Sequence, residues 1–236
     1  MRFKIFKGVN YIEQKCLNRG VSKYPFDNRT SKDNEKLSKH LDNRHTNLSL
    51  VNDIFKKYNI KYCLSSGSLL GPLRNGDLIL HDYDDDLWVF NYISNECINT
   101  LIQNNFTIER YEGTYVISIM RNNCPIDLCF KYELDNYLYT TPSPRKHVFT
   151  ESKKFYENCK TIQLRGVEYP IPNYSERYIN FIYNDWKIPN AFGLHRGNNN
   201  PSDPYIVFLK EEESFIDINK YKTLICPEGK INIFFI

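Results

Sequence analysis

The stretch LILHDYDDDLWVF, residues 78–90, crowds four aspartates between apolar residues: Asp82, Asp84, Asp85 and Asp86. In a β-strand successive side chains point to opposite faces, so Asp82, Asp84 and Asp86 are expected to share one face. Three carboxylates on one face repel each other and are unfavourable without a cation among them. Ligands that are all oxygen suit Mg²⁺ or Mn²⁺ and do not suit zinc. The spacing therefore favours a metal site over the simpler alternative, an exposed acidic turn.

A second candidate element, SGSLLGPLR, lies upstream of the acidic stretch. Gly67 lets the backbone approach a phosphate closely, and Ser68 together with the N–H groups of a helix start can bind one. Arg74 follows, and its guanidinium could hold a second phosphate oxygen. A phosphate cradle beside carboxylate-held Mg²⁺ is what metal-assisted phosphoryl or nucleotidyl transfer requires. The two elements together predict an enzyme of that class.

The hydrophobic pattern predicts the elements that position these residues. Helices are expected at 47–60, within 68–76, at 91–106 and at 172–186. The second of these is a short helix that Ser68 caps and Pro72 limits to about one turn. Strands are expected at 61–67, 78–90, 106–111, 115–120, 124–132, 136–142 and 231–236, whereas 142–165 stays unassigned. The order predicts an α+β fold with a mixed sheet.

The chain divides into two parts by composition. Residues 1–45 are polar and charged and are predicted to form an N-terminal arm or irregular extension. Residues 46–236 are predicted to form a single catalytic domain, which is an ordinary size for one hydrophobic core.

Composition and charge exclude several other classes of protein. Hydrophobic residues make up 41% and charged residues 25% of the chain, which is typical of a globular protein and not of a disordered one. The net charge is only +3 and no basic tract is present, so no nucleic-acid partner is expected. Seven cysteines without a CxxC pair indicate reduced thiols rather than a disulfide framework or a zinc site. Because no apolar signal segment or membrane-length run is seen, we expect no transmembrane segment and a cytoplasmic location.

The sequence SGSLLGPLRNGDLILHDYDDDL, residues 66–87, closely resembles the signature of the LicD/fukutin family. That signature runs from Gly-Ser or Gly-Thr through Leu-Leu-Gly, an Arg and a Gly to an acidic strand of the form Asp-x-Asp-x-Asp. The fukutin-related branch is the most similar. Members of the family transfer phosphocholine or phospho-ribitol from a CDP-linked donor to a glycan. The resemblance therefore implies a nucleotidyltransferase-type mixed β-sheet flanked by helices, with a helical C-terminal portion.

The resemblance also implies roles for individual residues. CPIDLCF resembles the family's second acidic strand, in which Asp127 either completes the metal site or acts as the base. The expected metal ligands are Asp82, Asp84, Asp86 and Asp127. The expected catalytic residues are Asp84, Asp86 and Asp127. The residues expected to bind the phosphates of the donor are Gly67, Ser68 and Arg74. The candidates for the substrate side are Tyr83, His195 and Arg196, and Trp186 is interpreted as packing that covers the site.

The function implied by the resemblance is a Mg²⁺- or Mn²⁺-dependent transfer of a phospho-alcohol group from a CDP-linked donor to a hydroxyl of a glycan or glycoconjugate. A first alternative is a nucleotidyltransferase, which leaves a nucleoside monophosphate on its acceptor and releases pyrophosphate. A second alternative is a catalytically silent glycan-binding or scaffold protein. The intact set of carboxylates argues against the silent protein, because like charges crowded together serve no purpose in it.

Overall fold

The computed structural model describes residues 31–80, 82–112, 116–134, 137–140, 147–153, 156–183, 186–188 and 216–217. Within these residues the chain forms a mixed β-sheet, a separate two-stranded hairpin and four α-helices. None of the helices in this part of the chain combines the length and the apolar character needed to cross a membrane.

The sheet is built around β5 (Cys124–Leu134), which pairs with β2 (Asp85–Phe90) in parallel and with β4 (Val116–Arg121) in antiparallel orientation. β1 (Tyr62–Leu64) extends the sheet beyond β2, and β3 (Thr107–Glu112) extends it beyond β4. The C-terminal part of β5 also pairs with β6 (Tyr137–Thr140). β6 pairs in turn with β7 (His147–Ser152), and β7 pairs with β10 (Ile216–Asp217). A parallel pair among antiparallel pairs makes the sheet mixed, which confirms the predicted α+β class.

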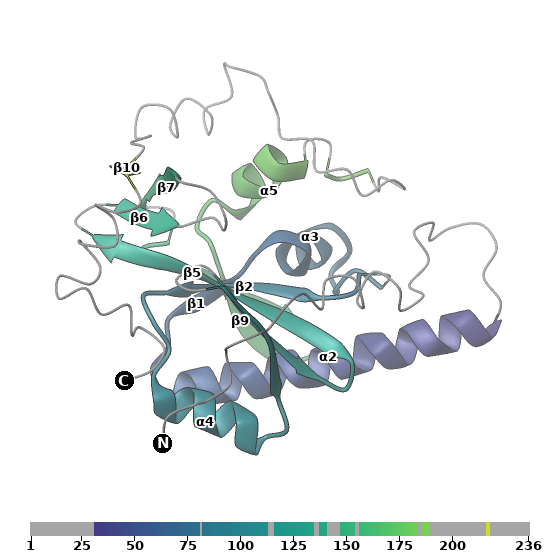
Figure 1. The fold of residues 1–236 in the computed structure, drawn as a ribbon. Coiled ribbons are helices and arrows are strands. Elements are labelled where there is room, and N and C mark those ends of the chain that lie inside the picture. The colour runs from purple at the N-terminus through teal and green to yellow at the C-terminus, as the bar shows by residue number, and fades with distance from the viewer. Residues whose placement is uncertain are drawn as a thin grey trace.

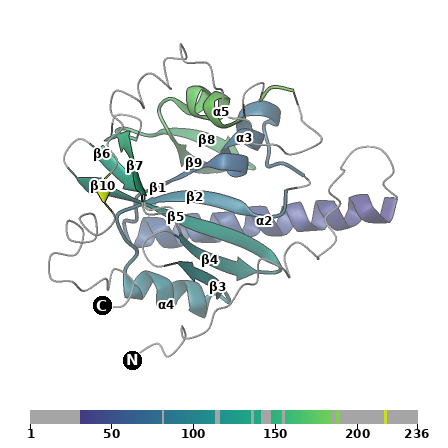
Figure 2. The same cartoon turned by 45° about the horizontal axis from the view of Figure 1, so that its top comes forward.

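Helices cover both faces of the sheet (Figures 1 and 2). α2 (Ser31–Lys57) and α4 (Asn95–Gln103) lie on one face, and α3 (Ser66–Asn75) and α5 (Ser175–Tyr183) lie on the other. The hairpin of β8 and β9, whose bounds are Lys160–Leu164 and Val167–Ile171, contacts β1 through β9. α5 is the helix that the sequence predicts in the C-terminal portion.

The alternation of side chains in β2 connects the two helical layers. Leu87 and Val89 are fully buried and belong to the main hydrophobic core, which α2 completes with Val51 and Phe55. On the opposite side of the strand, the indole N–H of Trp88 donates to the hydroxyl of Tyr178 in α5, at 3.1 Å. Burial of each large apolar side chain stabilises the fold by roughly 1.5–3 kcal/mol. β2 is therefore held from both faces, and Asp86 lies on the face of α5.

Helix α2 begins at Ser31, so the expectation of an irregular arm is wrong for residues 31–45. The segment before residue 46 has few apolar residues, and its helical periodicity is correspondingly weak. Two of its buried side chains are polar instead, Arg44 at 0% and His45 at 8% exposure. Buried polar side chains leave no hydrophobic pattern, which is why the sequence placed the helix start too late.

Two boundaries near the acidic stretch also differ from the prediction. α3 starts at Ser66 after the cap residue Ser65, and Pro72 lies inside it, so neither the Ser68 cap nor the one-turn limit is correct. The strand expected at 78–90 is confirmed only from Asp85 onward. Asp82 and Asp84 therefore precede the strand, and the argument from strand alternation does not apply to them.

The other predicted elements match the structure well. The helix at 91–106 appears as α4, and its first turn is capped by the Ser94 hydroxyl, which accepts from the Cys97 N–H at 3.2 Å. The predicted meander corresponds to β3, β4 and β5, and β6 follows it. β7 and the first strand of the hairpin fall in the segment that sequence left unassigned. The strand expected at 231–236 lies outside the described residues.

Candidate active site

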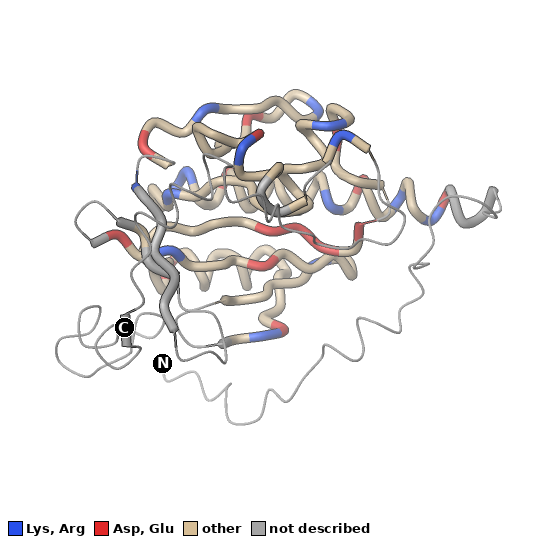
Figure 3. Tube along the Cα trace, turned by 90° about the horizontal axis from the view of Figure 1, so that it is seen from above, with Lys and Arg blue, Asp and Glu red and all other residues tan. Residues whose placement is uncertain are grey.

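A row of polar side chains runs across four strands at one level of the sheet. Asp86 of β2 is the register partner of Asp127 in β5, and Asp127 is the partner of Ser118 in β4. Ser118 is in turn the partner of Arg110 in β3. Partner residues on neighbouring strands point to the same face, so this row brings two of the predicted carboxylates together. In Figure 3 the acidic run of β2 and the loop before it crosses the middle of the molecule in red.

Asp127 is oriented by two residues of that row. The hydroxyl of Ser118 donates to Oδ1 of Asp127. The Nη1 atom of Arg110 lies 3.7 Å from Oδ2 of the same carboxylate. Sequence reasoning found Asp127 but missed both neighbours, because their contribution depends on how β3 and β4 align.

Arg44 of α2 holds the loop that carries Asp82 and Asp84 by hydrogen bonds to its backbone carbonyls. Its Nη1 donates to the carbonyls of Ile79 at 2.7 Å and Asp82 at 3.2 Å. Its Nη2 donates to the carbonyl of Asp84 at 2.9 Å. Buried backbone carbonyls need a hydrogen-bond donor, and the Arg44 guanidinium supplies one to three carbonyls of this segment, so Arg44 holds the path of the loop.

Asp85 differs from its acidic neighbours. Its side chain is fully buried and forms a bidentate ion pair with Arg44, with N–O distances of 2.7 and 3.1 Å. With these two contacts and three to carbonyls, all five N–H groups of Arg44 have acceptors. Asp85 is therefore a structural carboxylate that faces α2, as strand alternation predicts, and is not available to a ligand.

Gly67 and Ser68 lie at the start of α3, directly beside the acidic loop. A Cβ added to Gly67 would lie 2.3 Å from Oδ2 of Asp82, so only glycine allows this carboxylate to approach the helix so closely. Ser68 is fully buried. Its hydroxyl donates to Asp85 at 2.9 Å and accepts from the N–H of Asp86 at 2.9 Å. The hydroxyl of Ser68 thus links α3 to β2. For Gly67, the contact to a donor phosphate stays a prediction.

Arg74 lies at the end of α3 and is partly buried. Burial lowers the pKa of its guanidinium, and the nearby Asp82 carboxylate opposes that shift. Its Nε donates to the side chain of Asn75 at 3.2 Å. The influence of Asp82 places Arg74 on the side of the acidic loop, and phosphate binding by Arg74 stays a prediction.

The carboxylates of the site raise each other's pKa. Burial is the largest cause of the rise in the pKa of Asp84 to about 7, and the charge of Asp82 is the next. Burial also raises the pKa of Asp86 well above its usual value, and the charges of Asp84 and Asp127 add to this. Both residues nevertheless keep some solvent-accessible surface. A bound divalent cation would offset the repulsion that contributes to these shifts.

The chemistry of this donor set fits Mg²⁺ or Mn²⁺, because every member of the set is a carboxylate. Within the described residues, however, no three His, Cys, Asp or Glu side chains converge tightly enough to form a finished ligand group. The assignment of a metal therefore rests on charge and ligand type, and the identity of the ion stays a prediction.

The remaining substrate-side candidates have different positions. Tyr83 is partly exposed on the acidic loop, where its carbonyl lies 3.2 Å from Nε2 of His40 and its ring stacks on the imidazole at 6.1 Å between centroids. His195 and Arg196 lie outside the described residues. Trp186 is 8% exposed and belongs to the main core, consistent with a packing role.

Tyr183 of α5 is a further aromatic residue at the site. Burial raises the pKa of its hydroxyl, and the charges of Asp86, Asp82 and Asp84 contribute to the rise. The hydroxyl also interacts with the side chain of Ser66, at the first position of α3. α5, which packs against α3, therefore brings Tyr183 near the carboxylates.

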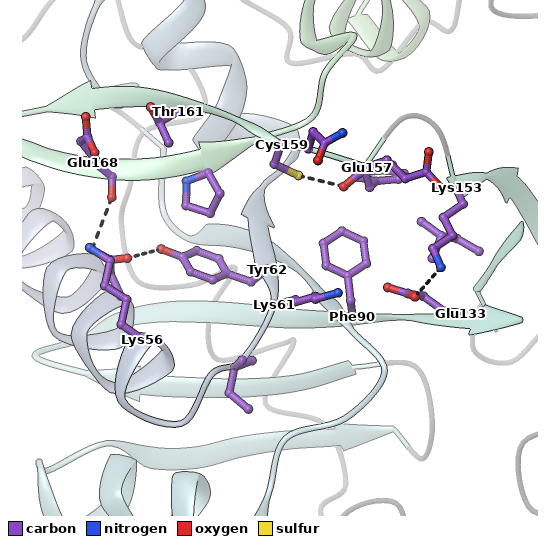
Figure 4. A pocket seen from close by; sticks show the side chains of 16 residues that line it. Lys56, Lys61, Tyr62, Phe90, Glu133, Lys153, Glu157, Cys159, Thr161 and Glu168 are labelled. Carbon is purple, nitrogen blue, oxygen red and sulfur yellow. Dashed lines mark hydrogen bonds and ion pairs between the residues drawn. The ribbon is translucent and has the colours of Figure 1, made fainter. Parts of the chain in front are cut away.

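A pocket of about 800 Å³ lies elsewhere, between the end of α2, β1 and the β8–β9 hairpin (Figure 4). None of the predicted site residues lines it. Its charged residues are three lysines and three glutamates: Lys56, Lys61, Lys153, Glu133, Glu157 and Glu168. Because these charges balance, the pocket offers no preference for a phosphate, and the carboxylate row remains the candidate active site.

Comparisons with known proteins bear on the same region of the chain. Residues 59–174 match a protein family described as LicD/FKTN/FKRP, nucleotidyltransferase domain. Among solved structures, the chain is similar to the crystal structure of lincosamide antibiotic adenylyltransferase LnuA, lincomycin-bound. The identity is 13%, the TM-score is 0.48, and the similarity covers 70% of this chain and 95% of that chain. This likeness carries no argument about function. No curated protein matches the chain significantly.

Proposed function

The chain belongs to the LicD family through the domain at residues 59–174, and from this membership we propose that it is a metal-dependent phosphotransferase. The proposed reaction moves a phospho-alcohol group, such as phosphocholine or ribitol phosphate, from a CDP-linked donor to a hydroxyl of a glycan or glycoconjugate. The observation that carries the proposal is the gathering of carboxylates around the register pair Asp86 and Asp127, inside the region that matches the family.

The residues that would hold Mg²⁺ or Mn²⁺ are Asp82, Asp84, Asp86 and Asp127. A bound ion supplies positive charge at the oxygens of the diphosphate, where negative charge develops as CMP leaves. Asp84 and Asp86 support this assignment because burial and the charges of neighbouring carboxylates raise the pKa of both, and a cation at the site would offset that repulsion. Gly67 and Arg74 are the proposed contacts to the donor phosphates, and Ser68 supports them by fixing α3 to β2.

The transfer step forms one bond and breaks one bond. The acceptor hydroxyl oxygen attacks the phosphorus that carries the alcohol, and the bond from that phosphorus to the bridging oxygen breaks. CMP leaves with the bridging oxygen, and the proton of the acceptor hydroxyl passes to a base. Asp127 is suited to receive that proton or to complete the metal site, because Ser118 and Arg110 fix its orientation.

The first test is CMP release from CDP-choline and CDP-ribitol, with Mg²⁺, with Mn²⁺ and with EDTA. We expect metal-dependent CMP release, which hydrolysis of the donor can produce even without the acceptor. Asp86→Asn should remove it, whereas the control Asp53→Asn, which changes an exposed carboxylate on α2, should not. Pyrophosphate released from a nucleoside triphosphate, without CMP from either donor, would instead establish the nucleotidyltransferase alternative.

The second alternative, a silent glycan-binding or scaffold protein, is tested by metal binding itself. A cation that binds the folded state raises the melting temperature, and the rise grows with cation concentration. We expect Mn²⁺ to raise the melting temperature of the wild type more than that of Asp86→Asn. Equal responses of the two proteins, together with no turnover of either class of donor, would support the silent protein.

A further inference from the structure

Two cysteines from distant parts of the chain meet in the fold. Cys63 lies in β1 and forms a small buried cluster with Phe90 and Leu138. Cys159, which directly precedes β8, packs against the same cluster. The side chains of Cys63 and Cys159 are hydrogen-bonded to each other, and neither residue forms a disulfide in the structure. The fold therefore brings together two thiols that no motif in the sequence connects.

The alternation of β1 explains the direction of the Cys63 side chain. Tyr62 and Leu64 belong to the main core, so Cys63 between them faces the opposite side of the sheet. Its register partner in β2 is Trp88, whose side chain reaches α5 on that side. Cys63 is thus placed between the sheet and the segment that leads into the β8–β9 hairpin.

A tight turn directly before Cys159 brings the second thiol to this place. The N–H groups of Tyr156 and Glu157 donate to the carbonyl of Lys153, at 2.9 and 3.0 Å. Asn158 follows with a φ of 55°, in the left-handed region that asparagine tolerates better than most residues. The chain changes direction here, and Cys159 is the first residue after the turn.

The two thiols differ in their access to solvent. Cys159 is partly exposed and lines the pocket of about 800 Å³ beside β1 (Figure 4). Cys63 has no exposed surface. A small solute that enters the pocket can therefore contact Cys159 directly, whereas it does not contact Cys63.

The surroundings of Cys159 favour its thiolate form. The hydrogen bond with Cys63 is the largest cause of a lowered pKa at the Cys159 thiol, and the charge of Lys61 on the pocket wall also lowers it. Burial acts in the opposite direction and is outweighed. In its protonated form Cys159 donates only a weak sulfur hydrogen bond, to the carbonyl of Tyr156 at 3.3 Å. The thiolate is the nucleophilic form of cysteine, so these contacts favour reaction at Cys159.

Three other cysteines in the described part of the chain have less reactive surroundings. Burial raises the pKa of Cys97 to about 12 and that of Cys124 to about 11. Burial also raises the pKa of Cys129 well above its usual value. Cys97 and Cys124 are fully buried as well. Oxidation of cysteine follows thiolate character and exposure, and Cys159 combines both with a neighbouring thiol.

We propose that Cys159 and Cys63 form a peroxide-sensitive dithiol, in which Cys159 is oxidised first and Cys63 then closes a disulfide. This is a modification site separate from the carboxylate row, since none of the predicted site residues lines the pocket. The proposal does not depend on the proposed function, because it concerns the thiols alone.

The reaction consists of two balanced steps. The sulfur of Cys159 attacks one oxygen of hydrogen peroxide, the O–O bond breaks, and the thiol proton leaves with the other oxygen as water. Cys159 is then a sulfenic acid. The sulfur of Cys63 attacks the sulfur of Cys159, the S–O bond breaks, and the Cys63 proton leaves with that oxygen as a second water. Two thiols are oxidised to one disulfide, and one peroxide is reduced to two waters.

The first experiment maps the product in the wild type. The folded protein is treated with hydrogen peroxide, its remaining thiols are alkylated, and unreduced peptides are analysed by mass spectrometry. We expect a peptide pair joined through Cys63 and Cys159 that dithiothreitol separates, while Cys97 stays alkylated. Because the link closes a long loop of the chain, the oxidised protein should also melt at a higher temperature than the reduced one. A disulfide between other cysteines, or Cys159 that stays reduced, overturns the proposal.

The second experiment tests the order of the two steps with dimedone, which traps sulfenic acids. Cys63→Ser keeps a hydroxyl donor beside Cys159 but cannot form the disulfide. In this variant we expect dimedone to label Cys159 at least about 10-fold faster than Cys97. In Cys159→Ser, the buried Cys63 should stay unlabelled. Equal labelling of Cys159 and Cys97 in the first variant, or labelling of Cys63 in the second, overturns the assigned order. Melting temperatures identify a variant that fails to fold, in which case the peptide map of the wild type decides.

Discussion

Arg44 and Asp85 form a bidentate ion pair, with distances of 2.7 and 3.1 Å, in which neither side chain is exposed. The pair lies directly beneath the acidic loop, and the same guanidinium binds the carbonyls of Ile79, Asp82 and Asp84. Arg44 precedes the region that matches the family, so the family signature alone does not include the residue that shapes its acidic loop.

Substitution of one partner of this pair should be strongly destabilising. Arg44→Met leaves the buried carboxylate of Asp85 without its cation, and we expect a loss of about 3–5 kcal/mol in the free energy of unfolding. Urea denaturation measures the loss. The double variant Arg44→Met with Asp85→Leu removes both charges and should recover part of it. If the double variant is less stable than the single one, an unpaired Asp85 charge is not the cause of the loss, and the hydrogen bond that Asp85 accepts from Ser68 stabilises the fold more than its charge destabilises it.

The raised pKa of Asp84 predicts how stability depends on pH. Its folded value is about 7, above the 3.8 of an ordinary aspartate, so the folded state holds this proton more tightly than the unfolded state. The stability that Asp84 contributes is therefore complete below about pH 4 and is lost as the pH rises toward and through 7. In EDTA, the melting temperature of the wild type should fall across this window.

Asp84→Asn should reduce the fall in melting temperature between pH 4 and pH 8, because the substituted side chain does not titrate. At pH 8 in EDTA the variant should melt above the wild type although it has lost turnover. Mn²⁺ should raise the melting temperature of the wild type at pH 8 and have much less effect on the variant. Parallel curves for both proteins from pH 4 to 8 would show that Asp84 is not the group that titrates.

Asp127→Asn should weaken Mn²⁺ binding, because Asp127 is the register partner of Asp86 and shares its face of the sheet. We expect at least a 10-fold loss of affinity, of the size that follows removal of one charged contact to an ion. Electron paramagnetic resonance of Mn²⁺ measures the free ion directly. Unchanged affinity combined with lost CMP release would instead assign Asp127 the role of the base.

The carboxylates were predictable because they are unusual for their surroundings. Aspartates in an otherwise apolar stretch are conspicuous in a sequence, and Asp127 within CPIDLCF is conspicuous for the same reason. The order of strands after α4 was predictable as well, because alternating apolar residues and turns define each strand of the meander. Sequence could not place Asp82 and Asp84 correctly, since the loop is shaped by Arg44 and not by its own residues.

The site residues that sequence missed come to Asp127 through the pairing of strands that are separate in the sequence. Ser118 and Arg110 reach Asp127 only because β3 and β4 pair as they do, and a bulge of one residue changes which side chain faces the row. Ser68 shows the opposite error, since its type fits a phosphate but its position within α3 turns it toward β2. Residue type predicted the chemistry, whereas only pairing and helix rotation show which residues take part.

Gly67 tests whether the close approach of α3 to the acidic loop matters for the site. In Gly67→Ala the new methyl group would lie 2.3 Å from Oδ2 of Asp82, so that carboxylate must move. We expect weaker Mn²⁺ binding and slower CMP release, with a smaller effect on the melting temperature.

Gly166→Ala is the matched control, because that glycine has a φ of +81° in the β8–β9 turn and no atom within 4 Å of an added Cβ. Its substitution should cost about 1–2 kcal/mol of stability through backbone strain and leave Mn²⁺ binding unchanged. The two variants thus separate crowding at Asp82 from general destabilisation. If Gly67→Ala binds Mn²⁺ as tightly as Gly166→Ala does, the carboxylate of Asp82 is not part of the metal site, and Asp84, Asp86 and Asp127 remain as its ligands.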